Sequence, residues 1–439
     1  MERIFRILVV VFLLVPDGDV LGQEDPTVLR GRVECRGAAV PYASLQLQGT
    51  SIGVASNDAG EFELKLPAGT ESDTVVVRSV GYVPVKVAVG ELAARGVVRL
   101  EEQAVTLRAV EVKSWRSAQH LLEAAVRRID SNYCQQTSWS TFFYRDWRAV
   151  DGELYLFDEA VLSVRRKSYA QYADKRGYHF ANDRREMATN YKTLLRHRLV
   201  VYDRTLLEGK VNDPAGVNEM MEYADNEDFY DPVSTPQASF ALSRRTLAQH
   251  KFEPLQEFVA DGEVFYLVRS VGPGHISQAK VHYEYTIRKS DLAIVAITAA
   301  HSIDNMMASD DAWINMDFSR MSIDKDSSAW SYDVREGRYT LTHYYNSRTL
   351  HLGAGDRWRF VPQQGWQRCV DWTLTDFALQ APTSTGEVLK ARPQNLAGAF
   401  GESDYNADFW GHYNTVLIDS LPLRLLKEKL SKIKRDEKN

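Results

Sequence analysis

The sequence predicts an α+β protein that is mainly β. A small N-terminal β-sandwich is followed by a larger domain, built on an antiparallel curved sheet with added helices. Residues 26–101 consist of short runs of alternating apolar and polar residues, which turn residues separate at regular spacing. Further along, Asp-Gly pairs at 151–152 and 261–262 lie between longer alternating runs, and this arrangement is a strong hairpin signal. The 439 residues leave room for two or three domains of roughly 100–200 residues each.

The first 22 residues predict a secretory signal peptide. Arg3 and Arg6 precede the apolar run 7–15, and residues 20–22 offer a cleavage site with small or modest side chains. This run is too short to span a membrane, and no later run reaches the roughly 18 apolar residues that a membrane helix needs. A buried N-terminal helix is the alternative. Because no cysteine follows the run, we expect no lipid anchor, and the exported chain would begin at Gln23.

Composition excludes one class of function. The net charge is −6 and 44% of the residues are hydrophobic, so the chain lacks the basic excess of a nucleic-acid-binding protein and can build ordinary cores. Its three cysteines allow at most one internal disulfide. A bond between Cys134 and Cys369 is one alternative, and buried free thiols, with Cys35 among them, are the other.

The strands of the predicted sandwich lie around residue 33 and at 43–47, 61–66, 75–77 and 83–89. Between the second and third, Asn57, Asp58 and Gly60 supply the chemistry of a tight turn. Ca²⁺ binding by Asp58 and Glu61 is an alternative interpretation. It is disfavoured because two acids give far fewer than the ~6–8 oxygen ligands that Ca²⁺ takes.

A series of motifs in this region is similar to the carboxypeptidase regulatory-like (transthyretin-like) domain. They are Gly31-x-Val33, Pro41-x-Ala43, Leu45-x-Leu47-x-Gly49-Thr50, Gly53, Asn57-Asp58-x-Gly60-x-Phe62-x-Leu64 and Val80-Gly81-Tyr82. The resemblance implies a seven-stranded β-sandwich without chemistry of its own, used as an attachment or spacer module in Gram-negative envelope proteins. It therefore implies a periplasmic or outer-membrane-associated protein. The family usually has Thr where Asn57 stands, and Asn keeps the turn plausible because it also bonds its own backbone.

Two further motifs resemble catalytic ones. Residues 49–53 match G-x-S-x-G, but that motif needs a strand before it and a helix after it, and another strand is expected here. His120 and Glu123 match the H-x-x-E zinc pair of metallocarboxypeptidases. They lie on a predicted amphipathic helix, and no matching third ligand stands out downstream. We therefore expect neither a metal nor a cofactor, and a surface role for His120.

The second predicted domain, residues 117–439, follows a linker strand at 102–116. It begins with a helix from Ser117 to Asn132, with Ser117 as the N-cap. Hairpins flank the two Asp-Gly pairs, a third turns at 289–291, and further strands are expected at 339–345 and 366–377. The charged insertion 175–251 is expected to form helices or long loops. Its acids could bind a cation or form a solvated loop; they are Asp225, Glu227, Asp228 and Asp231.

The hairpins of this second domain resemble lipoprotein-carrier-like open sheets. One feature of the resemblance is the strand that contains Asp291-Leu292-Ala293-Ile294. It implies a concave face, and carriage of a lipid or other apolar ligand becomes an alternative function.

The C-terminal region holds the densest aromatic cluster of the chain. Rings beside carboxylates and amides suit a glycan or other ligand, and they equally suit a core plug. The candidate ligand-binding residues are Tyr405, Asp408, Phe409, Trp410, Tyr413 and Asn414. A helix is predicted at 421–435, with four aliphatic residues on one stripe. It could dock on the body of the protein or lie on a membrane surface.

Together these patterns predict an exported, non-enzymatic cell-envelope protein. The sandwich would be an attachment module, and the sheet domain a binding or scaffolding surface for an envelope protein, a glycan or a lipid. The alternatives are an apolar-ligand carrier and a zinc-dependent or other hydrolase acting on peptides or glycans.

Overall fold

The computed structural model describes residues 26–50, 52–79, 82–102, 108–109, 117–166, 168–169, 192–202, 231–234, 241–260, 262–271, 280–302, 319–354, 361–381, 387–388 and 406–436. The predicted signal peptide and Tyr405 lie outside these residues, as do Asp225, Glu227 and Asp228.

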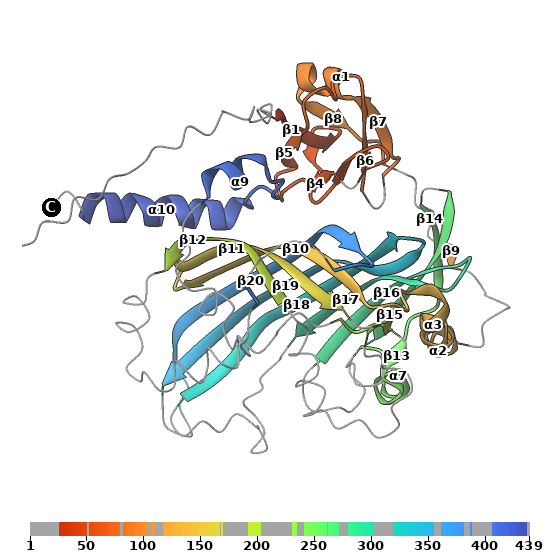
Figure 1. Cartoon of the computed structure of the whole chain (residues 1–439). Helices are drawn as coiled ribbons and strands as arrows, with labels where there is room; N and C mark the ends of the chain where they lie inside the picture. Colours follow the sequence, from red (N-terminus) through yellow and green to blue (C-terminus); the bar gives the residue numbers. More distant parts are fainter. Residues whose placement is uncertain are drawn as a thin grey trace, which may run out of the picture.

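The N-terminal part is a sandwich of two four-stranded sheets (Figure 1). One sheet contains β1 (Thr27–Cys35), β2 (Ala38–Ala39), β5 (Glu61–Leu66) and β8 (Val97–Arg99). The other contains β3 (Ser44–Leu47), β4 (Gly53–Ala55), β6 (Thr74–Arg78) and β7 (Val85–Ala88), and α1 (Val89–Arg95) follows it. Phe62, Leu64 and Leu66 of β5 are buried as the alternation predicted. The predicted β-sandwich is therefore confirmed.

The second part is built on one large sheet of thirteen strands. Its order is β21-β12-β11-β10-β20-β19-β18-β17-β16-β15-β14-β9, and β13 pairs beside β15. The strand pairs are antiparallel, so the predicted antiparallel sheet is confirmed. The strands are β9 (Arg108–Ala109), β10 (Ser138–Val150), β11 (Glu153–Arg166), β12 (Lys192–Tyr202), β13 (Lys251–Phe252), β14 (Gln256–Ala260), β15 (Glu263–Val271), β16 (Lys280–Arg288), β17 (Ile294–Ser302), β18 (Ser319–Arg335), β19 (Arg338–Ala354), β20 (Val361–Ala378) and β21 (Glu387–Val388).

The first Asp-Gly pair joins β10 to β11. Asp151 and Gly152 have φ angles of 51° and 76°, and left-handed conformations at both positions define the turn that suits a two-residue hairpin. Gly262, which precedes β15, also has a positive φ. The length of each turn sets which residues of the two strands that it joins lie opposite each other.

One part of the sequence interpretation is wrong. Residues 192–202 lie inside the segment that was expected to form helices or long loops, yet they form β12 and pair with residues 156–164 of β11. Charged residues at 196 and 198 masked the strand pattern. Arg196 and Arg198 are accommodated because their guanidinium groups lie over the rings of Phe409 and Trp410.

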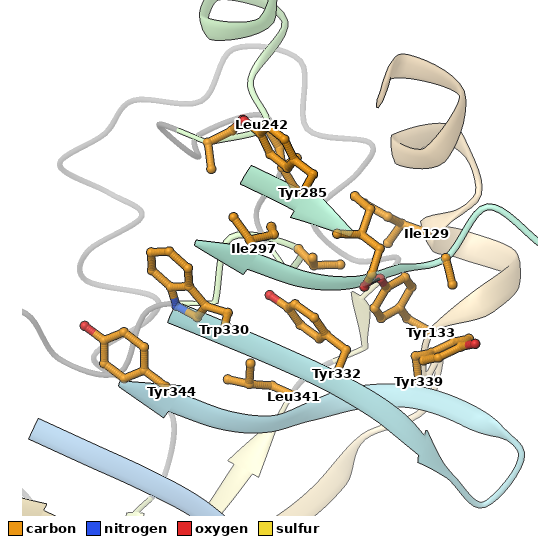
Figure 2. Close-up of a cluster of buried hydrophobic side chains, with 14 of the residues drawn as sticks. Ile129, Tyr133, Leu242, Tyr285, Ile297, Trp330, Tyr332, Tyr339, Leu341 and Tyr344 are labelled. Atoms are coloured by element: carbon orange, nitrogen blue, oxygen red, sulfur yellow. Dashed lines mark hydrogen bonds between the residues drawn. The ribbon is translucent and has the colours of Figure 1, made fainter. Parts of the chain in front are cut away.

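One face of the large sheet carries the main core, and we call it the inner face. Three helices contribute to this core, namely α2 (Ala118–Arg127), α3 (Ile129–Asn132) and α7 (Arg244–Gln249). Ser117 caps α2 as predicted, since its side chain accepts a hydrogen bond from the amide of His120. Figure 2 shows Tyr332 and Tyr339 beside Tyr133, and the ring centroids of these two residues lie 5.7 and 5.6 Å from that of Tyr133. Tyr133 donates its buried hydroxyl to the carbonyl of Ile294 at 2.5 Å.

The opposite face, called the outer face, packs against the C-terminal helices α9 (Ala407–His412) and α10 (Ser420–Asp436). The sandwich lies on this side as well (Figure 1). Leu425 and Leu426 of α10 are buried among Trp147 and Phe157, whereas Leu430 and Ile433 are exposed. Among the described residues, no helix has the length and apolar character required to cross a bilayer.

All three cysteines are buried free thiols. Of the two alternatives left open by the sequence, buried free thiols are therefore correct, and Cys134 and Cys369 form no bond with each other. The fold depends on its cores, without a covalent crosslink.

Gly31 of β1 provides a test of packing in the sandwich. A Cβ at this position would lie 2.3 Å from the carbonyl oxygen of Gly96 and 2.8 Å from the ring of Phe62. We expect Gly31→Ala to lower the free energy of unfolding by about 1–3 kcal/mol, because neither the backbone nor the ring can give way cheaply. The measurement is urea unfolding followed by far-ultraviolet circular dichroism, with hydrogen exchange of the amides of β1 and β5 as the local readout, because residues 26–101 contain no tryptophan.

Gly90→Ala is the matched control. Gly90 lies in α1, where a Cβ would meet only the carbonyl oxygen of Glu71 at 3.6 Å. Alanine favours a helix interior over glycine by up to ~1 kcal/mol, so this variant should be as stable as the parent or more stable. Equal stability of Gly31→Ala and the parent would contradict the packing described for β1.

Candidate functional site

The C-terminal segment 406–436 joins the sandwich to the outer face of the large sheet. Its first set of contacts on the sandwich side comes from the turn that the sequence identified. Asn57 donates its side-chain amide to the carbonyl of Ile418 at 3.2 Å. The amide of Asp58 donates to the Asp419 carboxylate at 2.9 Å. In return, the Asp58 carboxylate accepts hydrogen bonds from the backbone and hydroxyl of Ser420, both at 2.9 Å.

This exchange places a sandwich carboxylate at the start of α10. The first amides of a helix have no partner within the helix, and an acceptor there stabilises it. Asp58 supplies that acceptor from a distant part of the chain. The turn thus reverses the chain, as predicted, and also docks a helix. Burial, followed by repulsion from Asp58, raises the pKa of Asp419.

A second contact covers the edge of β5, which has one neighbour strand in its sheet. Asn414 accepts a hydrogen bond from the amide of Lys65 at 2.7 Å and donates to the carbonyl of the same residue at 2.9 Å. The Lys65 amine donates to the carbonyls of Trp410 and Tyr413 at 2.9 and 3.0 Å. Burial lowers the pKa of this amine. The side chain of Asn414 therefore acts like one residue of a neighbouring strand and protects an edge that would otherwise be open to pairing.

The sheet side of the junction is organised by a row of charges on the outer face. Arg145, Glu159 and Arg198 are directly opposite one another on β10, β11 and β12. Arg145 contacts the fully buried Glu159 at 2.8 Å and donates to the carbonyl of Val416 at 2.5 Å. Arg198 also pairs with Glu159, and its guanidinium lies 4.6 Å from the ring centroid of Trp410.

The aromatic residues predicted to bind a ligand lie inside this junction. Trp410 is buried, and Phe409 stacks on Tyr413 with ring centroids 5.0 Å apart. Tyr413 shares a hydrogen bond of 2.6 Å with Thr375, whereas Asp408 is exposed. The structure thus brings Phe409, Trp410, Tyr413 and Asn414 together, with their side chains engaged in contacts within the protein. This arrangement corresponds to the core-plug alternative for these four residues.

The inner face carries a second set of buried charges, which sequence reasoning missed. Arg148 of β10, Arg368 of β20 and Arg348 of β19 lie directly opposite one another on three adjacent strands. Asp326 of β18 faces Arg348 in the same register and contacts it at 2.8 Å. Asp146 contacts Arg148 at 2.6 Å and Arg368 at 3.4 Å. We call Arg148, Arg368 and Arg348 the arginine row.

All members of this set are nearly inaccessible to solvent. Burial acts to raise the pKa of Asp146, but Arg148 and Arg368 together lower it below the ordinary value. Tyr144 also donates its hydroxyl to Asp146 at 3.0 Å. Asp146 is therefore held as a carboxylate between two guanidinium groups.

A further inner-face pair lies one strand away. The Asp158 carboxylate is 2.6 Å from Nε2 of His197, and both side chains are buried. Burial raises the pKa of Asp158 to about 6 despite the hydrogen bond with His197. This carboxyl group therefore changes its protonation state in a pH range where ordinary aspartates remain charged.

The residues with catalytic motifs occupy ordinary positions. His120 is exposed in the first turn of α2, with Nδ1 at 3.3 Å from the Ser117 hydroxyl. Glu123 accepts a hydrogen bond from Gln119 of the same helix. In the described part of the chain, no three His, Cys, Asp or Glu side chains are grouped so that they could hold a metal ion.

Asp231, an acid of the predicted cation loop, is buried and has protein partners. It pairs with Arg166 and accepts hydrogen bonds from the hydroxyls of Tyr169 and Tyr332 at 3.0 and 2.8 Å. Its carboxylate thus ties the inner-face aromatic residues together.

Cys369 stands near a histidine–aspartate pair on the outer face, a combination that nucleophilic catalysis could use. His343 contacts Asp371 at 3.2 Å. Burial, however, raises the pKa of the Cys369 thiol to about 12. A thiol with this pKa is protonated at neutral pH, and only the thiolate is a competent nucleophile.

Comparison with known families identifies the first part of the chain. Residues 29–112 match the family model of the CarboxypepD_reg-like domain, which confirms the resemblance of the sandwich. No curated protein matches the chain.

Two solved structures are similar to part of the chain. A LolA superfamily protein from Nitrosomonas europaea is 11% identical, with 60% of this chain and 94% of that chain covered and a TM-score of 0.19. A DUF1329 family protein from Desulfovibrio piger is 13% identical, with 60% and 93% covered and a TM-score of 0.22.

Asp58→Ala tests the junction. It removes both acceptor contacts to Ser420, and the loss of a helix-capping acceptor costs roughly 0.5–2 kcal/mol. We expect faster hydrogen exchange in the first turn of α10, and unchanged exchange in the core of the large sheet. Glu71→Ala, at an exposed acidic position of the same sandwich, should leave both regions unchanged.

The double variant of Asp58→Ala with Ser420→Ala sharpens this test. If the two residues act through one contact, the second substitution adds little to the first. Fully additive effects, or unchanged exchange in Asp58→Ala, would contradict the docking role of the turn.

The pKa of Asp158 predicts a specific pH dependence. An unfolded aspartate titrates near ~4 and the folded one at about 6, so between these values the folded state binds more protons. The free energy of unfolding should therefore fall as pH rises from about 4 to about 6 and change no further above that range through this group. Urea unfolding of the parent and of Asp158→Asn across this range isolates the contribution. Parallel pH profiles for the two proteins would contradict it.

Proposed function

We propose that this chain is an exported, non-enzymatic binding or scaffolding protein of the cell envelope, located in the periplasm or at the outer membrane. The sandwich is the attachment module, and the large sheet is the body that binds or holds a partner. In this proposal residues 1–22 are the export signal, 26–101 the attachment module and 117–439 the body.

The junction made by residues 406–436 is the observation that supports this proposal. An attachment module on a flexible linker limits only the distance between the attachment point and the rest of the protein. Here the Asp58 turn and the edge of β5 are bonded to the segment that also packs on Trp147 and Phe157. Such contacts fix the orientation of the large sheet relative to the sandwich as well as its distance. A fixed orientation suits a protein that presents a binding surface, whereas a simple spacer does not need it.

Carriage of an apolar ligand is the second candidate. The observation that favours it is the succession of an aromatic layer and a charged layer on one face of the sheet, at Tyr144, Trp372 and Tyr344 and then at the arginine row. A ligand with an apolar part and a polar end would match this succession. Extraction of the purified protein into organic solvent tests this candidate, because a carrier should release a bound lipid, and the absence of any bound lipid would count against it.

Fractionation of cells that express the full chain tests the main proposal. We expect the protein in the envelope fraction, with an intact mass that corresponds to a chain beginning at Gln23, because the first residues have the composition of a cleaved signal. Replacement of Leu8, Val9 and Val10 by Asn should leave the full-length chain in the cytoplasm. Recovery of the uncleaved parent from the cytoplasm would overturn the proposal.

A further inference from the structure

The C-terminal helix α10 is docked along only its first half. Leu425 and Leu426 are buried against the outer face of the sheet, and Lys429, one turn further on, is buried as well. Every residue from 430 to 435 is exposed, and Figure 1 shows this end of the helix extending past the strands of the sheet. We call residues 430–436 the projecting end of α10.

The apolar stripe of the helix continues into the projecting end. Leu430 and Ile433 follow Leu426 by four and seven residues, so the three side chains lie on one side of the helix. Leu426 is 7% exposed, whereas Leu430 is 36% and Ile433 is 39% exposed. Single exposed aliphatic residues are common on protein surfaces. These two differ because they prolong a buried stripe beyond the sheet that covers it.

The charges around this exposed pair are mostly basic. Residues 420–436 contain six basic and two acidic residues, a net charge of +4, whereas the whole chain carries −6. Lys427 and Lys434 are exposed, and they lie three residues before and four residues after Leu430, hence beside it on the helix surface. A basic residue in the last turn complements the helix dipole, but this effect does not account for Lys427, which lies more than two turns from the end of α10.

The size and charge of this surface distinguish between two kinds of partner. A second copy of the chain would bring the same positive charge against itself. Two partly exposed aliphatic side chains are also far smaller than the ~1,200–2,000 Å² that a stable protein interface buries. An anionic lipid surface has the opposite charge, and a basic helix with aliphatic residues on one side is the kind of helix that lies in such a surface.

We infer that the projecting end of α10 binds the surface of an anionic phospholipid membrane. Leu430 and Ile433 would enter the boundary between the headgroups and the acyl chains, while Lys427 and Lys434 would contact lipid phosphates. The inference rests on the envelope location proposed above and names the surface that the protein meets there. Because α10 is bonded to both the sheet and the sandwich, its bound end would hold both parts at the membrane.

Co-flotation with lipid vesicles tests the inference. The vesicles consist of phosphatidylcholine alone or of phosphatidylcholine with roughly one third phosphatidylglycerol. They are mixed with the chain from Gln23 onward, which retains every described residue. We expect binding to the anionic vesicles to be at least about tenfold tighter, because each basic residue near an anionic surface contributes about fivefold. A higher salt concentration should weaken this binding.

Removal of two lysines isolates the electrostatic part. Lys427→Gln with Lys434→Gln should weaken binding to the anionic vesicles by about tenfold or more. The matched control is Lys86→Gln with Lys251→Gln, which removes the same charge at exposed positions of β7 and β13 and should change binding by less than about twofold. Glutamine is a good helix former, so far-ultraviolet circular dichroism should show the same helix content in both variants.

Two measurements address the apolar part and the location of the contact. Leu430→Gln with Ile433→Gln should weaken binding to the anionic vesicles by about fivefold, because it removes the side chains that would enter the boundary region. Hydrogen exchange of the parent protein needs no substitution. Anionic vesicles should slow exchange of the amides of residues 430–436 and leave those of β10 unchanged.

Four outcomes would overturn the inference. They are absence of vesicle binding, equal binding to the neutral and the anionic vesicles, undiminished binding after loss of Lys427 and Lys434, and slowed exchange confined to other parts of the chain. A dimer in analytical ultracentrifugation that Leu430→Gln with Ile433→Gln dissociates would also do so, since a second copy would then cover the stripe. Vesicle binding is measured on purified protein, so a failed fractionation experiment would leave it standing, and failed vesicle binding would leave the envelope location intact.

Discussion

Burial of both faces of β10 is the constraint on which the rest of the structure depends. A strand that is solvated on one face can place its charges in water, but eleven of the thirteen residues of β10 are buried and the other two are partly buried. Every charged residue of this strand therefore needs a partner inside the protein. Arg145 faces outward and is neutralised by Glu159; Asp146 and Arg148 face inward and neutralise each other. Because side chains alternate between the two faces of a strand, the short sequence Arg-Asp-Trp-Arg contributes charges to two separate groups, one on the outer face and one on the inner face.

The outer system explains why the C-terminal segment is held where it is. The guanidinium of Arg145 pairs with the Glu159 carboxylate and also donates hydrogen bonds to the backbone carbonyls of residues 416 and 417. One side chain therefore neutralises a buried charge in the sheet and holds the irregular segment in place. Trp410 is then enclosed between Arg198 and the apolar residues Phe143 and Val161. The sandwich is fixed in turn by side chains of Asn414 and Asp419 that imitate backbone partners. Charge balance in the sheet and the position of the sandwich are therefore parts of one arrangement.

Sequence reasoning predicted the elements that depend on local chemistry. The Asp151-Gly152 hairpin, the Ser117 cap and the alternation in β5 each need only near neighbours in the chain, and each was found. It failed at β12, where Arg196 and Arg198 break the apolar alternation and are compensated by rings some 210 residues away. The arginine row was also missed, because its members are separated by 20 residues or more and only the strand register aligns them. A pattern within one segment does not show which distant strand or ring the segment will contact, so contacts of this kind could not be predicted from the sequence.

The junction also has a consequence for assembly of the protein. The junction joins residues 57–65 of the sandwich, together with Tyr42, to residues 410–420, which lie about 350 residues later in the chain. Domains generally fold as units in the order in which they are made. A chain that leaves a ribosome or a translocation pore from its N-terminus would therefore carry a finished sandwich for most of its length before the closing segment emerges. Until then the contacts that hold the two bodies in one orientation cannot form, so their rigid arrangement follows the folding of each body.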